Sequence, residues 1–340
     1  MQQAYSFDDL LLVPKYSDIK SRSEVDISNE LGGAIKLSLP VVSSPMDTVT
    51  ESAMIHAMDE RGALGIAHRY NTIEEQSDIV ARAASSGAKN IAAAVGMTGD
   101  FLERSVSLVA AGANVLCVDV AHGHHSVMER CLKTLKDKFS EQTHVMAGNV
   151  ATVEAYEFLS SLGADSVRVG IGGGSICSTR IVTGHGVPTL QSVFDCAKSS
   201  HSAKIIADGG IKTTGDMVKA LAAGADFVMI GSMLAGTTET PGEVFTSADG
   251  KKYKVYRGMA SHAAQKNWRG KSSTPEGIST TVPYRGDVGL ILDDIDGGIR
   301  SGFSYSGCRN IKELWSRSQF IVQTSAGQSE SNTHILWRNK

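Results

Sequence analysis

A short apolar run followed by a loop and then a helical pattern recurs along the chain, with eight such runs between residues 40 and 232. The loops carry glycine or polar residues, and several of the helical patterns end at glycine, as helix C-termini often do. The apolar runs are PVVSS (40–44), ALGIAH (63–68), NIAAAVG (90–96), VLCVDVAHG (115–123), HVMAGN (144–149), SVRVGIG (166–172), KIIADGG (204–210) and DFVMIGS (226–232). The helical patterns between them include residues 72–87, 100–112, 152–163 and 214–224.

Continuous apolar runs, as opposed to alternating ones, are typical of strands that are buried on both faces of a parallel sheet. Eight such strands alternating with helices predict an α/β fold, a (β/α)8 TIM barrel. A doubly wound open sheet is the alternative. In a barrel the loops that follow the strands meet at one face, so their polar and glycine residues are the first candidates for a functional site.

The chain after the eighth run does not repeat the unit and predicts a C-terminal extension of the barrel. Residues 247–259 predict a hairpin with an Asp-Gly pair at its turn. The polar stretch 262–281 predicts a lid loop over the barrel mouth, and residues 325–340 predict a tail. No linker or low-complexity segment divides the chain, so we expect residues 1–340 to form a single domain.

Charge and composition argue against several classes of protein. The formal net charge is −3, which gives no reason to expect binding to nucleic acid. No apolar run approaches the ~20 residues that span a bilayer, and the N-terminus lacks a secretory signal, so we expect a cytoplasmic protein that binds no membrane. Five cysteines without a CxxC pair argue against a disulfide framework or a structural zinc site.

Three glycine-rich loops predict a phosphate site. Residues 172–175, Gly-Gly-Gly-Ser, follow the sixth run, while ADGG (207–210) and IGS (230–232) belong to the ends of the seventh and eighth runs. Backbone N–H groups of such loops can converge on a phosphate, and TIM barrels often bind phosphate after these two strands. Turn geometry alone is the alternative reason for these glycines.

Cys177 ends the first of these loops and is the candidate nucleophile. It lies between polar residues, where backbone N–H dipoles favour a thiolate. The other four cysteines lie in strand-like or helix-like contexts and are expected to be buried and inert. His122, His124 and His125 lie close together in sequence, yet a zinc site usually takes ligands from more than one element. Asp119, at the end of the fourth run, is placed to accept hydrogen bonds from a ribose or nicotinamide group.

Several motifs, in the same order along nearly the whole chain, resemble those of the IMP dehydrogenase/GMP reductase family. They are SSPMDTVTE (43–51), GNVAT (148–152), VGIGGGSICSTRIVTGHGVP (169–188), IIADGGI (205–211), VMIGSMLAG (228–236), YRGMAS (256–261), PEG (275–277) and VPYRGDV (282–288). The resemblance implies a (β/α)8 barrel, usually tetrameric, that binds a purine nucleoside monophosphate and a nicotinamide cofactor.

The resemblance also implies a role for individual residues. Cys177 would attack C2 of the purine, and Thr179 with Glu276 would form a proton-transfer pair. The residues implied to bind the nucleotide are Ser44, Met46, Ser175, Asp208, Gly209, Gly210, Gly231, Ser232, Gly258, Met259, Ala260 and Gly277. Those implied to bind the cofactor are Ser21, Arg22, Arg69, Asp119, Val120, Ala121, Asn149 and Gly172, with Ser21 and Arg22 reaching the cofactor of a neighbouring subunit. The backbone carbonyls of Gly172, Gly174, Cys177 and Arg180 would bind a monovalent cation such as K⁺. Ala260 departs mildly from the family, which often has Gly or Ser there.

The family contains two reactions that share a covalent thioimidate at C2. A GMP reductase forms it by expelling ammonia from GMP and reduces it to IMP with NADPH. An IMP dehydrogenase forms it by passing hydride from IMP to NAD⁺ and hydrolyses it to XMP with the help of an Arg-Tyr pair in a mobile flap. The corresponding segment here, HAAQKNWRGKSST (262–274), has no Arg-Tyr pair, and residues 81–96 run on without the CBS domains that most dehydrogenases insert.

These two features favour GMP reductase. Residues 325–336 and 179–188 resemble dehydrogenases at least as much, so an IMP dehydrogenase that lacks CBS domains is the alternative. Arg69 stands where reductases often have Lys. A purine-nucleotide-binding barrel without turnover is an alternative of another class, although it would have no need to keep Cys177, Thr179 and Glu276 together. On fold alone, a flavin-dependent barrel oxidoreductase is a further alternative.

Overall fold

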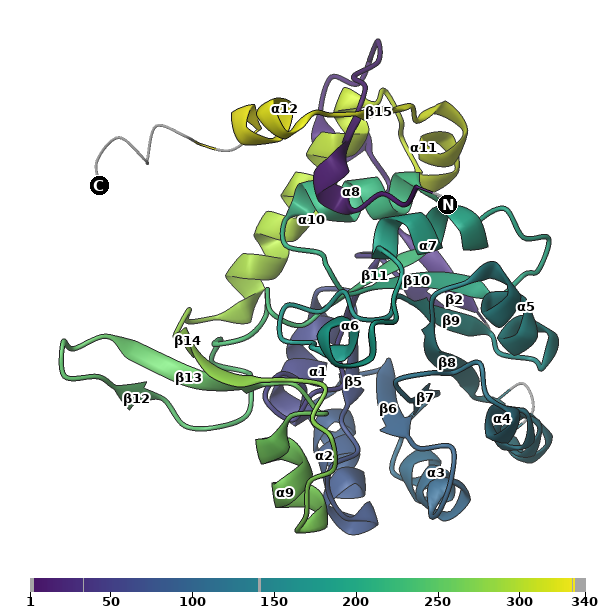
Figure 1. Cartoon of the computed structure of the whole chain (residues 1–340), viewed down its shortest axis with the longest axis vertical. Helices are drawn as coiled ribbons and strands as arrows, with labels where there is room; N and C mark the ends of the chain where they lie inside the picture. The colour runs from purple at the N-terminus through teal and green to yellow at the C-terminus, as the bar shows by residue number, and fades with distance from the viewer. Residues whose placement is uncertain (1–2, 33, 140–141, 332, 334–340) are drawn as a thin grey trace.

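Eight parallel strands close into a barrel in the computed structural model, which describes residues 3–32, 34–139, 142–331 and 333. Their order around the barrel is β10-β11-β4-β5-β6-β7-β8-β9 (Figure 1). The strands are β4 (Val41–Ser43), β5 (Leu64–Ala67), β6 (Ile91–Val95), β7 (Val115–Asp119), β8 (His144–Val150), β9 (Ser166–Val169), β10 (Lys204–Asp208) and β11 (Phe227–Ile230). Each strand lies on one of the eight apolar runs. Val228 of β11 pairs with Val41 of β4 and closes the ring, so the TIM barrel is confirmed and the open sheet is wrong.

Both faces of the strands are buried, which explains why the runs do not alternate. In β6, Ala92 and Ala94 belong to the cluster inside the barrel, together with side chains such as Phe227. Ala93 and Val95 belong to the larger cluster between the strands and the surrounding helices. The hairpin of β2 (Asn29–Gly32) and β3 (Ile35–Leu37) contributes further apolar side chains to the inner cluster.

Helices surround the barrel. They are α1 (Ser52–Glu60), α2 (Ile73–Ser85), α3 (Phe101–Ala110), α4 (Ser126–Phe139), α5 (Val153–Ser161), α7 (Thr189–Cys196), α8 (Thr214–Ala222) and α10 (Val288–Tyr305). The four helical patterns predicted from the sequence correspond to α2, α3, α5 and α8. Thr72, Thr152 and Thr213 cap α2, α5 and α8 by accepting a backbone N–H with the side-chain oxygen, which fixes the start of each helix.

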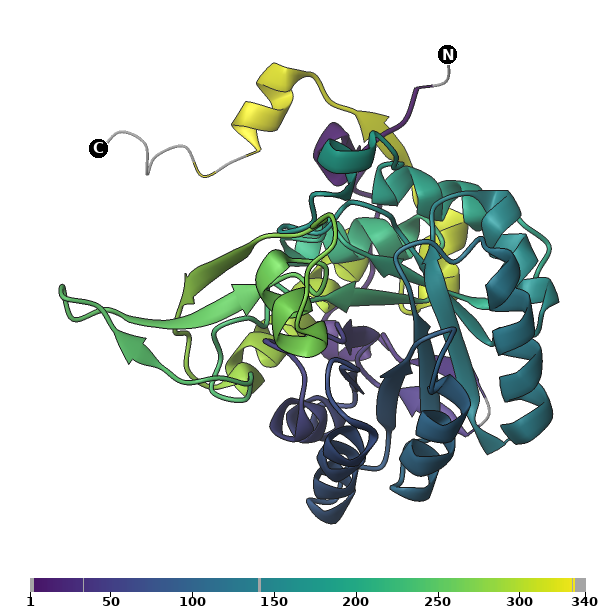
Figure 2. The same ribbon diagram turned by 60° about the horizontal axis from the view of Figure 1, so that its bottom comes forward.

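An appended sheet and helix follow the barrel. Strands β12 (Phe245–Thr246), β13 (Lys252–Arg257) and β14 (Ser279–Pro283) form an antiparallel sheet. Figures 1 and 2 both show this sheet extending away from the barrel. The β12–β13 pair confirms the predicted hairpin, and Gly250 takes a positive φ of 81° in its turn.

The predicted lid loop over 262–281 is wrong as a description of the backbone. Residues 262–269 form helix α9 (His262–Arg269), and the end of the segment belongs to β14. Ser261 caps the start of α9 by accepting the N–H of Ala264, and Gly270 ends it with a left-handed φ of 69°. These two local signals form the helix despite its polar composition.

The remaining elements lie near the chain ends or beside the site. They are η1 (Phe7–Asp9), β1 (Leu10–Leu12), η2 (Arg22–Glu24), α6 (Thr179–Thr183), α11 (Ile311–Arg317), β15 (Phe320–Val322) and α12 (Ser325–Glu330). The first residues of the predicted tail therefore form α12, while residues 332 and 334–340 lie outside the described part. No helix in the described part of the chain is long and apolar enough to cross a membrane.

Candidate active site

A cavity of about 340 Å³ opens where the barrel strands end. Its lining comes from the ends of these strands and the loops after them, together with the segments around Met259 and Glu276. Every residue expected to bind the nucleotide lines it, as do Cys177, Thr179 and Glu276. The glycine loops predicted to hold phosphate therefore meet at one place.

The thiol of Cys177 begins a short chain of hydrogen bonds. It lies 3.2 Å from Thr179 Oγ1, and the Thr179 hydroxyl donates to Glu276 Oε2 at 2.8 Å. The backbone supports this arrangement, since Ser178 N–H donates to the Glu276 carbonyl at 2.9 Å. A carboxylate that reaches the thiol through one hydroxyl can move a proton to or from a group bound at the sulfur.

The other four cysteines are buried and lie away from this chain of hydrogen bonds. Burial raises the pKa of Cys117, Cys131 and Cys196 to about 12 each, and it also raises that of Cys308. These thiols stay neutral near pH 7, and neutral thiols are poor nucleophiles. Cys177 is the half-buried one, on the cavity wall.

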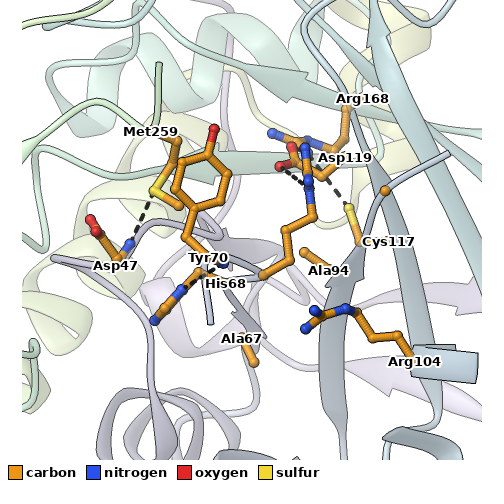
Figure 3. A network of polar contacts seen from close by, with 12 residues as sticks. Asp47, Ala67, His68, Tyr70, Ala94, Arg104, Cys117, Asp119, Arg168 and Met259 are labelled. Atoms are coloured by element: carbon orange, nitrogen blue, oxygen red, sulfur yellow. Dashed lines mark hydrogen bonds and ion pairs between the residues drawn. The ribbon is translucent and has the colours of Figure 1, made fainter. Parts of the chain in front are cut away.

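Arg168, in the middle of β9, links two carboxylates on the cavity wall. It donates to Asp119 Oδ1 at 2.5 Å (Figure 3). It also donates to Asp208 Oδ2 at 2.9 Å. Asn149 also donates to Asp208, at 2.7 Å. Burial opposes the charge of Arg168, but the carboxylate of Asp208, the Cys117 thiol and the carboxylate of Asp119 raise its pKa well above the usual value.

Sequence analysis missed Arg168. The signal was present, since an arginine inside the apolar run SVRVGIG has to find a partner when the run is buried. Gly148 makes room for it, because a Cβ there would lie 2.6 Å from the Arg168 Cβ. Asp119 and Asp208 thus lie on the cavity as predicted, held by a shared guanidinium.

Helix α9 is anchored next to the cavity by an aromatic stack. The rings of Trp268 and Tyr70 stack with centroids 4.1 Å apart, and the Arg269 guanidinium lies 4.2 Å from the Trp268 ring centroid. Arg69 flanks the same stack at 5.5 Å from Trp268 and pairs with Asp119 at 3.6 Å. Arg69 and Tyr70 line the cavity, so α9 is anchored on its wall. The sequence did not single out Tyr70 or Trp268 for this contact.

The remaining residues expected to bind the cofactor divide into two groups. Val120, Ala121, Asn149 and Gly172 line the cavity together with Arg69 and Asp119. Ser21 and Arg22 do not line it; Arg22 begins η2, and Ser21 caps it by accepting the N–H of Ser23. Their expected role toward a neighbouring subunit stays a prediction.

The carbonyls expected to bind a monovalent cation lie in the loop between β9 and α7. Those of Gly174 and Arg180 already accept the N–H groups of Cys177 and Gly184, at 3.1 Å each. The Arg180 side chain lies outside the cavity and donates to the carbonyls of Ile171 and Val187 at 3.1 and 2.6 Å. The Arg180 guanidinium thus binds two carbonyls of this segment other than the four expected to bind a cation.

No group of three or more His, Cys, Asp or Glu side chains in the described part of the chain could hold a metal ion. His122 and His124 contact each other edge to face with ring centroids 6.5 Å apart. His124 packs against Phe158 at 5.0 Å. The third histidine, His125, accepts the N–H of Val127 with its Nδ1 at 3.1 Å.

A half-buried thiol, a hydroxyl–carboxylate pair and glycine loops at the carboxyl ends of the strands define a TIM-barrel enzyme with its site at the usual face. Comparison with known proteins gives the family. The model of the IMP dehydrogenase / GMP reductase domain matches residues 4–334. The chain therefore belongs to the IMP dehydrogenase/GMP reductase family, oxidoreductases that act on purine nucleotides.

Individual relatives carry both names. The chain is 36% identical to the inosine-5′-monophosphate dehydrogenase of Nitrosopumilus maritimus, over 98% of each chain. It is 32% identical to the GMP reductase of Leishmania major, over 99% of this chain and 98% of the relative. A crystal structure of a GMP reductase variant from Trypanosoma brucei in complex with guanosine 5′-monophosphate superimposes with a TM-score of 0.92, at 31% identity and 98% of each chain.

Proposed function

We propose that this protein is a GMP reductase, which converts GMP, NADPH and two protons to IMP, NADP⁺ and ammonium. The Cys177 thiolate adds to C2 of the purine. The Thr179–Glu276 pair delivers a proton to the departing amine, and ammonia leaves a thioimidate on Cys177. A nicotinamide cofactor, which Asp119, Asn149 and Arg69 would hold, would supply a hydride to C2, and cleavage of the C–S bond would then release IMP and the Cys177 thiolate.

The placement of Arg269 carries this proposal. Hydrolysis of the thioimidate needs a base held within about 3 Å of the attacking water. Arg269 is the one arginine of residues 262–274. It stacks on Trp268, has no tyrosine beside it in sequence, and lies in a helix anchored to Tyr70. Reduction of the thioimidate is then expected to be faster than its hydrolysis.

The two sides of the cavity support binding of two ligands. The glycine loops and Ser175 suit a phosphate, and Asp208 suits a ribose hydroxyl. Asp119, Asn149 and Arg69 lie on the side where we place the cofactor. A complex with GMP is described for the Trypanosoma brucei relative, which supports a purine nucleotide as the substrate.

IMP dehydrogenase is the second candidate, since the Nitrosopumilus relative has this name and is 36% identical, against 32% for the Leishmania GMP reductase. The same Cys177 adduct would then form by hydride loss from IMP to NAD⁺ and be hydrolysed to XMP. Arg269 or the Thr179–Glu276 pair would have to activate the water.

Two assays with purified protein distinguish the candidates. GMP with NADPH is expected to give sustained loss of the reduced-nicotinamide absorbance with IMP and ammonia as products. IMP with NAD⁺ is expected to give at most a single-turnover burst with little XMP. Sustained XMP formation at a matching or higher rate would overturn the assignment, and nucleotide binding without turnover in either assay would indicate the non-catalytic barrel. Protein that is purified without yellow colour argues against a flavin.

We further propose a cytoplasmic homotetramer in which Ser21 and Arg22 reach the cofactor of a neighbouring subunit. We also propose that K⁺ binds at the carbonyls of Gly172, Gly174, Cys177 and Arg180. Light scattering in solution tests the tetramer. Replacing K⁺ by Na⁺ in the activity assay tests the cation, and an unchanged rate would contradict it.

A further inference from the structure

The loop between β5 and α2 carries two residues of the cavity wall, Arg69 and Tyr70. Tyr70 is also the surface on which Trp268 and helix α9 rest. The position of this loop therefore sets the cofactor side of the cavity and the attachment of α9 together.

A buried guanidinium forms hydrogen bonds with the end of this loop. Arg104, on α3, is only 5% exposed. It donates to the Asn71 carbonyl at 3.0 Å, to the Thr72 carbonyl at 3.4 Å and to Asn71 Oδ1 at 3.4 Å. Its ion pair with Asp100 measures 2.7 Å. The fork of the guanidinium thus joins the start of α3 to the loop residues directly after Tyr70.

Gln76, on α2 and fully buried, extends the contact to the strands. Its Oε1 accepts from Arg104 at 2.8 Å, and its Nε2 donates to the Ala94 carbonyl at 2.8 Å and the Ala67 carbonyl at 3.5 Å. Ala67 and Ala94 lie at or near the ends of β5 and β6. Figure 3 shows the Arg104 guanidinium directed toward these two residues.

The other side of the loop is held by His68. Its Nε2 lies 3.1 Å from Glu51 Oε1, and its Nδ1 accepts the N–H of Tyr70 at 3.3 Å. The loop is thus fixed both before and after Arg69 and Tyr70. Between these two fixed points, the Nε atom of Arg69 makes no hydrogen bond in the described structure. It forms an ion pair with Asp119 at 3.6 Å. The position of the Arg69 side chain therefore depends on the loop backbone and on the rings of Tyr70 and Trp268, whose centroids lie 5.6 and 5.5 Å from its guanidinium.

We propose that Arg104, together with Gln76, is a positioning residue for the cofactor side of the site. Neither residue lines the cavity, so each acts through the backbone of the loop that presents Arg69 and Tyr70. A buried ion pair adds little to stability compared with well-packed apolar side chains. Arg104 donates to the loop at Asn71 and Thr72 and also to Asp100 and Gln76, so its guanidinium fixes the geometry of the loop relative to α2 and α3. This inference rests on the proposed placement of the cofactor beside Arg69 and Asp119.

The experiment compares Arg104→Met and Arg104→Lys with Arg82→Met. Arg82 is the matched control, because it is an exposed arginine on α2 with an i,i+4 ion pair to Asp78. Arg104→Met is expected to raise KM for the nicotinamide cofactor about tenfold, since small misplacements far from the chemistry have effects of this size or larger. KM for the nucleotide is expected to stay within about twofold. Arg104→Lys keeps the positive charge but cannot form several hydrogen bonds in one plane, so its KM for the cofactor is expected to lie between those of the wild type and Arg104→Met. If the Met variant does not fold, the Lys variant is used for the test.

A second readout is independent of turnover. Trp268 is one of three tryptophans, so replacing Trp315 and Trp337 by Phe isolates its fluorescence. Arg104→Met is expected to change the emission of Trp268, because its stack on Tyr70 loosens, while Arg82→Met leaves it unchanged. Equal changes in both KM values, or a lower Tm with unchanged KM values and emission, would overturn the inference. If the wild type oxidises IMP with NAD⁺ instead, the proposed function fails, and the same comparison is made with KM for NAD⁺.

Discussion

The Thr179 hydroxyl donates to the Glu276 carboxylate at 2.8 Å, although 97 positions separate the two residues. Thr179 begins α6, directly after a barrel strand and its glycine loop, whereas Glu276 lies between α9 and β14. The carboxylate of the proposed proton-transfer pair thus comes from the appended part of the chain. Without the appended part, Cys177 would still contact the Thr179 hydroxyl, but the Glu276 carboxylate that accepts from this hydroxyl would be absent.

Thr179 and Glu276 are expected to act as one unit. Thr179→Val and Glu276→Gln should each lower kcat roughly 10²-fold, since each removes a link between Cys177 and the carboxylate. The double variant should lose far less than the product of the two single losses. Steady-state kinetics of the four proteins give the comparison, and strictly multiplicative losses would show that the two residues act independently.

Cys177→Ala is expected to abolish turnover, because the substitution removes the sulfur that forms the covalent adduct. Affinity for the nucleotide should change little, since Ser175, Asp208 and the glycine loops are unaltered. Calorimetric titration with GMP and the two turnover assays measure these properties. Cys196→Ala is the matched control, as that thiol is buried on α7. Appreciable turnover by the Cys177 variant would exclude a covalent mechanism at this residue.

Arg168→Met is expected to destabilise the fold by roughly 3 kcal/mol, because it leaves Asp119 and Asp208 without their shared cation. Urea unfolding measures the loss, with Arg82→Met expected to change stability by less than about 1 kcal/mol. A loss no larger than that of Arg82→Met would contradict the electrostatic explanation.

His144 is expected to make the protein sensitive to acid. Burial, opposed in part by Asp165, lowers its pKa from 6.5 to about 4, and its Nε2 lies 2.7 Å from Ser166 Oγ. Between these two values the unfolded chain takes up a proton that the folded chain does not, so stability falls as pH falls. The full difference is on the order of 3 kcal/mol. His144→Asn, which cannot titrate, should show a shallower loss of unfolding free energy from pH 6.5 to 4, and an identical slope would contradict this assignment.

The barrel could be predicted because its signal is local and repeated. The strands are mostly apolar and do not alternate, since both of their faces are buried, as Ala92 and Ala93 illustrate on opposite faces of β6. The candidate catalytic residues were inferred from motifs whose order and spacing resemble one family, and Cys177, Thr179 and Glu276 lie together on the cavity. Both kinds of signal are contained in short segments of sequence.

The parts that were missed depend on contacts between distant segments. Arg168 finds its partners 49 and 40 positions away, on β7 and β10, so the pairing exists only once the strands have assembled. Helix α9 has few apolar residues of its own. It is held by a serine cap, a terminal glycine and the stack of Trp268 on Tyr70, which comes from a loop near the second barrel strand.

The pairing of β1 with β15 has a consequence for how the chain is made. Leu10, Leu11 and Leu12 hydrogen-bond to a strand that lies near the other end of the sequence, at Phe320–Val322. During synthesis β1 leaves the ribosome first, and its leucines have no partner strand until β15 has been synthesised. An unpaired apolar edge is a template for aggregation. Chains halted before residue 320 should therefore be the form of this protein that most requires protection by a chaperone.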